Sequence, residues 1–193
     1  MAKSPIALVA VLYISAYAQN LPSGSLEKGT WELAIWTAGG HSVSGGTSET
    51  SVWNAGLRLG RVLTHDHGSG FSRGNLEYAG DVVPIYVLFF PRQTSYAGGF
   101  NPVILKWNFT SGQKVAPYFE FGGGVLLSLD DVPPGTSKVN FTPQASFGVQ
   151  IFGRGKRAVS LAGKYVHISN AGLATPNPGI NTLQFAIGYQ CFK

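Results

Sequence analysis

The chain has 193 residues, of which 44 % are hydrophobic, 12 % are aromatic and only 12 % are charged. The charged share is about half the roughly 25 % that is usual for soluble domains, and this balance excludes an intrinsically disordered chain. The 26 glycines argue against a helical bundle, because glycine destabilises helix interiors. A β-rich protein with one apolar outer face fits these values.

Residues 1–18 have the features of a secretory signal: Lys3, an apolar run at 6–14, and the small residues Ala16 and Ala18 at a cleavage site. We therefore expect residues 1–18 to be a signal peptide and residues 19–193 to form a single domain. An N-terminal anchor or a buried strand is the alternative for the leader. No later segment has the ~20 apolar residues of a transmembrane helix. An exported chain of this composition is expected to be a periplasmic soluble protein or an outer-membrane β-barrel.

Alternation of large apolar residues with small or polar ones predicts about eight β-strands, because successive side chains on a strand point to opposite faces. The clearest case is the last segment, where Leu183, Phe185, Ile187 and Tyr189 alternate with small or polar residues. The predicted strands lie near 29–38, 53–60, 75–90, 103–109, 115–125, 139–151, 157–169 and 181–191. Turn signals lie between them at 39–50, 65–74, 93–99, 111–112, 130–137 and 153–155.

The polar faces of these strands carry few Lys and Glu residues, so we expect the apolar faces to meet lipid. This predicts an all-β fold, an eight-stranded antiparallel transmembrane β-barrel. A soluble barrel with an apolar interior is the alternative. Six charged residues are expected to pair inside the barrel and fill it: Arg58, Glu77, Asp81, Lys106, Glu120 and Lys164. Aromatic residues near strand ends suit interfacial girdles, or alternatively a packed core: Trp31, Trp36, Trp53, Trp107, Tyr165, Tyr189 and Phe192.

The net charge of +5 is spread along the chain without a dense cluster, so we expect no nucleic-acid partner. Scattered cations fit ordinary solvation or contact with anionic lipid headgroups. The single cysteine, Cys191, provides neither a disulfide framework nor a cysteine metal site. His65, Asp66 and His67 form a weak metal-site candidate, for which a solvated loop is the expected interpretation. We expect no metal and no cofactor.

His167 and Ser169 continue the apolar face of the predicted strand 157–169. Two residues apart on a strand, they lie about 6.5–7 Å apart at the backbone and point the same way. An imidazole that removes the proton of a neighbouring hydroxyl makes it a nucleophile. Polar groups on a lipid-facing surface are unfavourable unless they serve a function. The alternative is that position 167 already lies among the headgroups, where both residues are tolerated.

The string HISNAG at 167–172, followed by PNPG at 176–179, closely resembles the signature of the outer-membrane lipid A 3-O-deacylases, an acyloxyacyl hydrolase-like family. The resemblance is strongest over 163–192 and looser at 99–102 and 107–109. It implies an eight-stranded outer-membrane barrel with its active site on the outer wall. It also implies lipid A, or lipopolysaccharide, as substrate, and hydrolysis of an ester-linked 3-hydroxyacyl chain by serine chemistry that needs no metal.

By position, the resemblance implies Ser169 as nucleophile, His167 as general base, and Asn170 with Gly172 in the oxyanion hole. The third catalytic residue, in the family a Glu that orients the His, falls at Asn181. An amide can hold an imidazole in the right tautomer but cannot neutralise the imidazolium, and no acidic residue follows position 131. Three interpretations remain: Asn181 is sufficient to orient His167, an acidic residue from elsewhere takes its place, or the barrel is inactive with a structural or glycolipid-binding role.

Overall fold

The computed structural model describes residues 25–112 and 114–193, so the expected signal peptide at 1–18 lies outside the described residues. In this part of the chain no helix has the length and apolarity needed to cross a membrane. A short 3-10 helix, η1 (Gly70–Ser72), lies in a loop. The described strands are β1 (Trp31–Val43), β2 (Ser51–Val62), β3 (Gly74–Phe89), β4 (Thr94–Phe109), β5 (Val115–Ser128), β6 (Val139–Phe141), β7 (Gln144–Phe152), β8 (Arg157–Ile168) and β9 (Ile180–Phe192).

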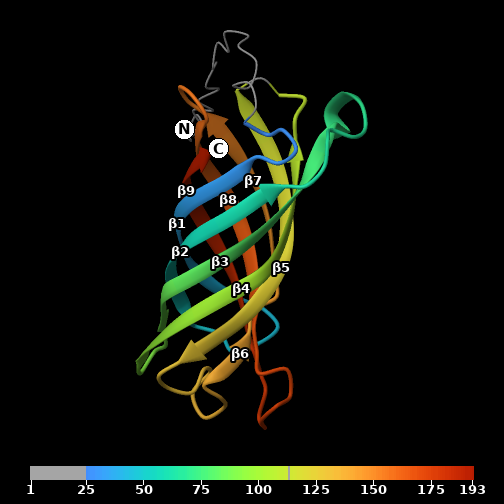
Figure 1. Cartoon of the computed structure of the whole chain (residues 1–193). Helices are drawn as coiled ribbons and strands as arrows, with labels where there is room; N and C mark the ends of the chain where they lie inside the picture. Colours follow the sequence, from blue (N-terminus) through green and yellow to red (C-terminus); the bar gives the residue numbers. More distant parts are fainter. Residues whose placement is uncertain (1–24, 113) are drawn as a thin grey trace, which may run out of the picture.

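Eight of these strands close into an antiparallel transmembrane barrel, as the sequence predicts (Figure 1). Strands β1 to β5 pair in chain order, β5 then pairs with β7, and β8 and β9 follow. The barrel closes where β9 pairs with β1, from Glu32 opposite Phe192 to Val43 opposite Asn181. We call the end where β1 begins and β9 ends the proximal end, and the opposite end, where β8 ends and β9 begins, the distal end.

The short strand β6 continues the line of β7 rather than adding a ninth wall strand, since both pair with β5. The sequence predicted one continuous strand over 139–151, and this was wrong at Thr142 and Pro143, which lie outside both strands. Proline has no N–H to donate to the ladder. The irregularity is next to the candidate site, because Pro143 accepts a hydrogen bond from the His167 backbone.

Two predicted turns were wrong in part, because glycines that lie in strands were taken as turn signals. Gly40 belongs to β1, and the loop that follows is residues 44–50. A Cβ at Gly40 would collide with the carbonyl of Leu183, so glycine here permits a close approach of β1 and β9. The predicted turn at 93–99 is largely strand, because β4 begins at Thr94. Gly99 within it faces the Val125 carbonyl, which a Cβ would approach to 3.3 Å.

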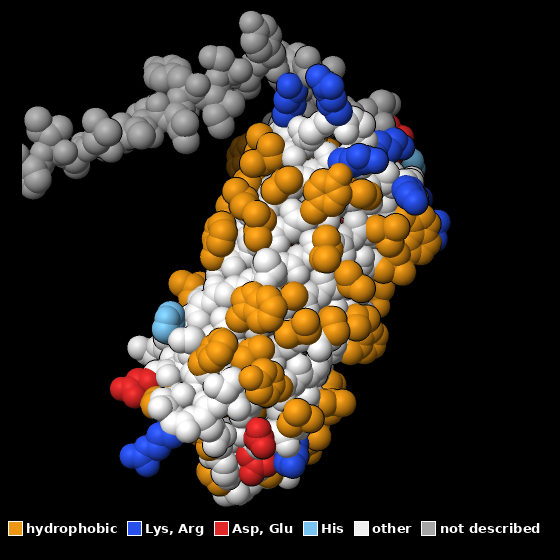
Figure 2. All heavy atoms as spheres, turned by 90° about the vertical axis from the view of Figure 1, so that its left-hand side faces the viewer, with side chains coloured by type: hydrophobic (Ala, Val, Ile, Leu, Met, Phe, Trp, Pro, Cys, Tyr) orange, Lys and Arg blue, Asp and Glu red, His pale blue; other side chains and the backbone are white. Residues whose placement is uncertain are grey.

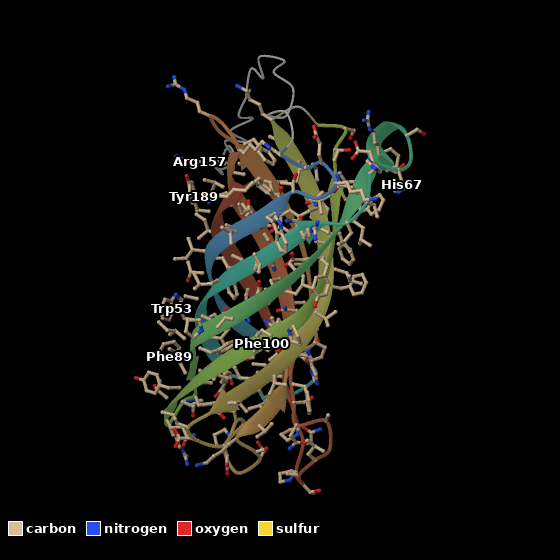
Figure 3. All side chains as sticks on the ribbon, viewed as in Figure 1. Trp53, His67, Phe89, Phe100, Arg157 and Tyr189 are labelled. Atoms are coloured by element: carbon tan, nitrogen blue, oxygen red, sulfur yellow. The ribbon has the colours of Figure 1, made fainter. Side chains whose placement is uncertain are left out.

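The outer wall carries the large apolar side chains. Ile35 is 60 % exposed and Phe185 is 62 % exposed. Figure 2 shows these hydrophobic side chains spread along the wall, with charged side chains at the two ends and many cations toward the proximal end. Trp53 and Phe89 project away from the wall in Figure 3. This arrangement contradicts the soluble-barrel alternative, in which the outer face would be polar.

Two of the expected girdle aromatics lie inside the barrel instead. Trp36 packs its ring 4.6 Å from Lys164 Nζ, and Phe192 packs against Phe152 at a centroid distance of 5.4 Å. Both occupy even positions on strands whose odd positions face outward, so parity places them inside. Trp31 and Tyr189 are on the outer surface, 43 % and 45 % exposed.

The charged residues predicted inside the barrel lie there, five of them buried and the Arg58 side chain only 9 % exposed, and most of them pair, which confirms that prediction. Arg58 lies 2.8 Å from an Asp81 carboxylate oxygen and 2.7 Å from one of Glu120. Such a bidentate arrangement suits the planar guanidinium group. The pairs link β2, β3 and β5 across the interior.

A second cluster includes Glu32, which sequence reasoning did not single out. Lys106 Nζ lies 2.6 Å from Glu32 and 3.1 Å from Glu77, and all three side chains are fully buried. Apolar plugs lie beyond the charges. The plug toward the distal end includes Ile168 and Ile180, the residues that end β8 and begin β9. The filled interior holds both strands rigidly next to the candidate site.

Replacing Lys106 with Met should destabilise the barrel strongly, because it leaves two buried carboxylates without a cation. The expected loss is about 3–5 kcal/mol of unfolding free energy, measured by urea titration of the protein folded in lipid vesicles. Arg73→Met is the matched control, because its ion pair with Asp66 is exposed and should contribute only about 0–1 kcal/mol. Equal losses in the two variants would contradict this account of the interior.

Candidate active site

The residues singled out as nucleophile and base lie at the distal end of β8. His167 is the second-to-last residue of β8. Ser169 follows directly after Ile168, where the chain enters the loop 169–179 at the bottom of Figure 1. The alternation that places Tyr165 on the outer wall extends to His167, and Ser169, which is bridged to Phe141, follows at the same parity. His167 is partly exposed, whereas Ser169 is 8 % exposed.

Ser169 is held by the sheet although it lies beyond β8. Its N–H donates to the Phe141 carbonyl at 3.1 Å, and the Phe141 N–H donates back at 2.7 Å. The His167 N–H donates to the Pro143 carbonyl at 3.0 Å. Strand β6 therefore extends the ladder past the end of β8, so the candidate nucleophile sits on a fixed backbone.

The imidazole of His167 is hydrogen-bonded to Asn181, its neighbour across the β8–β9 pair. The distance from Nδ1 to Asn181 Oδ1 is 2.5 Å. The amide nitrogen of Asn181 donates to the carbonyls of Ser44 and Gly45, at 3.2 and 2.8 Å. Because both amide hydrogens are engaged there, the oxygen accepts from the ring, so Nδ1 carries the hydrogen and Nε2 is left as an acceptor.

Two loops enclose the imidazole. Gly179, with a φ of +66°, lies so close that a Cβ there would come 3.0 Å from His167 Cε1. The β1–β2 loop docks on the same residue, because the Thr47 N–H donates to the Gly179 carbonyl at 2.8 Å. A Cβ on Gly46 would come 2.7 Å from that carbonyl oxygen. Glycines thus allow the loops to close around the ring.

The expected oxyanion-hole residues organise the β8–β9 loop in this structure. Asn170, 1 % exposed, donates from its amide to the carbonyls of Ala174 and Pro176, at 3.1 and 3.4 Å. Its side-chain oxygen accepts from the Gly172 N–H at 2.9 Å, which is an Asx-turn. Ala171 and Gly172 have φ values of 53° and 80°, in the left-handed region. The Asn170 side-chain amide and the Gly172 N–H therefore both donate hydrogen bonds within the loop.

Sequence reasoning missed three groups that support the site. The carbonyls of Ser44 and Gly45 are backbone groups, so no residue type in the sequence identifies them. Their contact with Asn181 can be recognised only once β1 and β9 are paired. Asn177 accepts from the Asn170 N–H at 3.1 Å, and its place in the turn-rich PNPG string was an available signal. Within the described residues no hydrogen bond joins the side chains of His167 and Ser169. Such bonds commonly tighten only in the substrate complex.

The weak metal-site candidate lies on the β2–β3 loop, away from the distal end (Figure 3). No group of three or more His, Cys, Asp or Glu side chains is placed to hold a metal in the part of the chain that the structure describes. Asp66 instead accepts hydrogen bonds from Thr110, Asn75 and Arg73, at 2.8, 3.0 and 3.0 Å. Partial burial acts to raise the pKa of Asp66, but these bonds outweigh it and lower that pKa.

Replacing Asn170 with Ala should loosen the β8–β9 loop while leaving the barrel folded, because three side-chain hydrogen bonds are lost. Amide hydrogen exchange at Gly172 should become roughly tenfold faster or more, as expected for about 1–2 kcal/mol of lost local stability. Ser137→Ala, in another distal loop, is the control and should not change exchange at Gly172. Unchanged exchange in Asn170→Ala would show that the Asx-turn does not organise the loop.

The chain is similar to a known protein family and to proteins of known structure. A model of the family described as lipid A 3-O-deacylase (PagL) matches residues 39–190. The crystal structure of the outer membrane enzyme PagL is 20 % identical, with a TM-score of 0.59 over 82 % of this chain and 98 % of that one. The crystal structure of Neisserial surface protein A (NspA) is 14 % identical, with a TM-score of 0.52 over 85 % and 97 %. Among curated proteins none matches this chain.

The structural likenesses show the shared barrel, and the family match spans most of the sequence, including the candidate site. The chain belongs to the lipid A 3-O-deacylase (PagL) family.

Proposed function

We propose that this protein is an outer-membrane serine esterase that hydrolyses the 3-O-linked 3-hydroxyacyl ester of lipid A in lipopolysaccharide. The family's name supplies the substrate class. The observation that carries the proposal is the hydrogen bond between His167 Nδ1 and Asn181 Oδ1. This bond leaves Nε2 of His167 free to accept a proton, and His167 is two residues before Ser169 in the chain. No metal or cofactor has a role in the proposed reaction.

In the proposed mechanism His167 Nε2 takes the proton of Ser169 Oγ as that oxygen attacks the ester carbonyl. The tetrahedral intermediate collapses, and the imidazolium gives its proton to the sugar oxygen as it leaves. The acyl chain remains as an ester on Ser169. His167 then activates a water, which releases the 3-hydroxy fatty acid and restores the hydroxyl. Asn181 holds the imidazole in the tautomer that both steps require.

Asn170 and Gly172 are proposed to stabilise the oxyanion. The Gly172 N–H bonds to Asn170 Oδ1, so oxyanion binding exchanges this bond for one to a charged oxygen. Charge-assisted hydrogen bonds are roughly twice as strong as neutral ones, which favours the exchange as negative charge develops. Removal of one such donor typically lowers kcat by about 10²–10³-fold.

The position of the site on the wall suits a lipid ester. The pair His167–Asn181 is the next pair of the same parity after Tyr165–Leu183 in the β8–β9 ladder, and the side chains of Tyr165 and Leu183 are 42 % and 58 % exposed on the apolar wall. The site therefore lies where the apolar wall gives way to loops, the level at which a lipid's acyl chains join its headgroup. The proposal places the distal end at the outer leaflet and the proximal end in the periplasm.

A second candidate is an inactive barrel with a structural or glycolipid-binding role. It is favoured by the amide at position 181, since an amide cannot neutralise the imidazolium that forms during catalysis. The two candidates share the fold and the membrane location. They differ in whether ester cleavage depends on Ser169.

Ser169→Ala and His167→Ala should each lower release of 3-hydroxy fatty acid from lipid A by at least ~10³-fold, because nucleophile and base act as a unit. Mass spectrometry of lipid A before and after incubation measures this release. Ser160→Ala is the matched control, because Ser160 lies on the inner face of the same strand, and it should retain wild-type activity. Wild-type release no higher than that of Ser169→Ala would favour the inactive barrel.

A further inference from the structure

We propose that the backbone carbonyls of Ser44 and Gly45 are positioning groups that make an amide, and not a carboxylate, the effective partner of His167. The inference rests on the proposed function and concerns its orienting residue. It predicts that restoring an acid at position 181 impairs the site. The β1–β2 loop thereby becomes part of the catalytic machinery.

The orientation of the Asn181 amide is fixed by its three hydrogen-bond partners. The nitrogen donates to the carbonyls of Ser44 and Gly45, and the oxygen lies 2.5 Å from His167 Nδ1. Reversing the amide would set its oxygen against the two carbonyl oxygens and leave both without a donor. Both hydrogen bonds would be lost and the oxygen atoms would repel one another, so the reversed orientation is disfavoured.

This orientation removes the main defect of an amide in a catalytic triad. When Asn replaces Asp in a serine protease, kcat falls about 10⁴-fold because the imidazole adopts the wrong tautomer. That loss arises when the amide nitrogen donates to Nδ1 and the ring hydrogen moves to Nε2. In this chain the nitrogen is already engaged with the loop, so Nδ1 keeps the hydrogen and Nε2 remains the base.

A carboxylate at position 181 does not fit the same surroundings. In the isosteric Asn181→Asp variant, a charged oxygen would take the place of Nδ2, which lies 2.8 Å from the Gly45 carbonyl oxygen and 3.2 Å from that of Ser44. Three oxygen atoms without a hydrogen between them repel one another. The β1–β2 loop must then move, and this loop is hydrogen-bonded to Gly179 beside the imidazole.

The loop backbone is also shaped to receive an amide. Gly45 has a φ of +101°, a conformation that residues with a Cβ rarely adopt, and a Cβ there would come 2.8 Å from Asn181 Nδ2. Glycine at position 45 therefore allows the carbonyl to approach the amide. Gly45→Ala disturbs this contact without altering any side chain of the proposed triad.

The first test compares the kcat/KM of folded, purified variants on lipid A. Asn181→Asp should fall at least about tenfold below wild type, which corresponds to about 1.4 kcal/mol. Gln93→Glu is the matched control, because Gln93 is an exposed amide in the β3–β4 loop at the same end, where its nitrogen donates to Ser95 Oγ at 3.4 Å, and it should retain wild-type activity. Activity of Asn181→Asp equal to or above wild type would overturn the inference.

The second test needs no turnover. Nitrogen-15 NMR of the His167 ring should show the Nδ1–H tautomer in wild type and in Ser169→Ala. Asn181→Ala and Gly45→Ala should both shift His167 toward the Nε2–H form. An Nε2–H ring in wild type, or an unchanged ring in both variants, would overturn the inference. If only the proposed esterase function is wrong, the wild-type protein will show the Nδ1–H tautomer but will release no 3-hydroxy fatty acid in a Ser169-dependent way.

Discussion

The hydrogen bond between His167 and Asn181 is the interaction on which the site depends. It joins the last residues of β8 to the first residues of β9, on the wall that meets lipid. The same amide also holds the β1–β2 loop beside the imidazole, through the carbonyls of Ser44 and Gly45. A single side chain thus sets the imidazole's tautomer, its orientation and the loop that covers it.

The barrel provides the rigidity that this bond requires. Buried ion pairs and apolar plugs fill the interior, so the wall strands have fixed registers and the outward residues fixed positions. The backbone of Ser169 is also held although it lies beyond β8, since Phe141 of β6 forms a bridge with it. The fold therefore builds the proposed site from backbone hydrogen bonds between strands, and the loops cover it and carry the proposed oxyanion donors.

Much of this architecture can be read from the sequence because a membrane barrel has a strict two-residue period. Parity placed Phe185 outside and Lys106 inside, and it placed His167 with Ser169 on one face. Glycine was the main source of error, since Gly40 serves close strand approach and not a turn. The roles of Ser44 and Gly45 were beyond sequence reasoning, because backbone carbonyls have no side-chain signature and meet Asn181 only after β1 pairs with β9.

The most direct test of the central claim is covalent labelling of the folded barrel with a lipophilic phosphonate that reacts with activated serines, followed by peptide mass spectrometry. The account predicts modification at Ser169 in wild type and its loss in His167→Ala, because the hydroxyl reacts only when the imidazole removes its proton. An unmodified Ser169 in the folded wild-type protein, or equal labelling without His167, would contradict it.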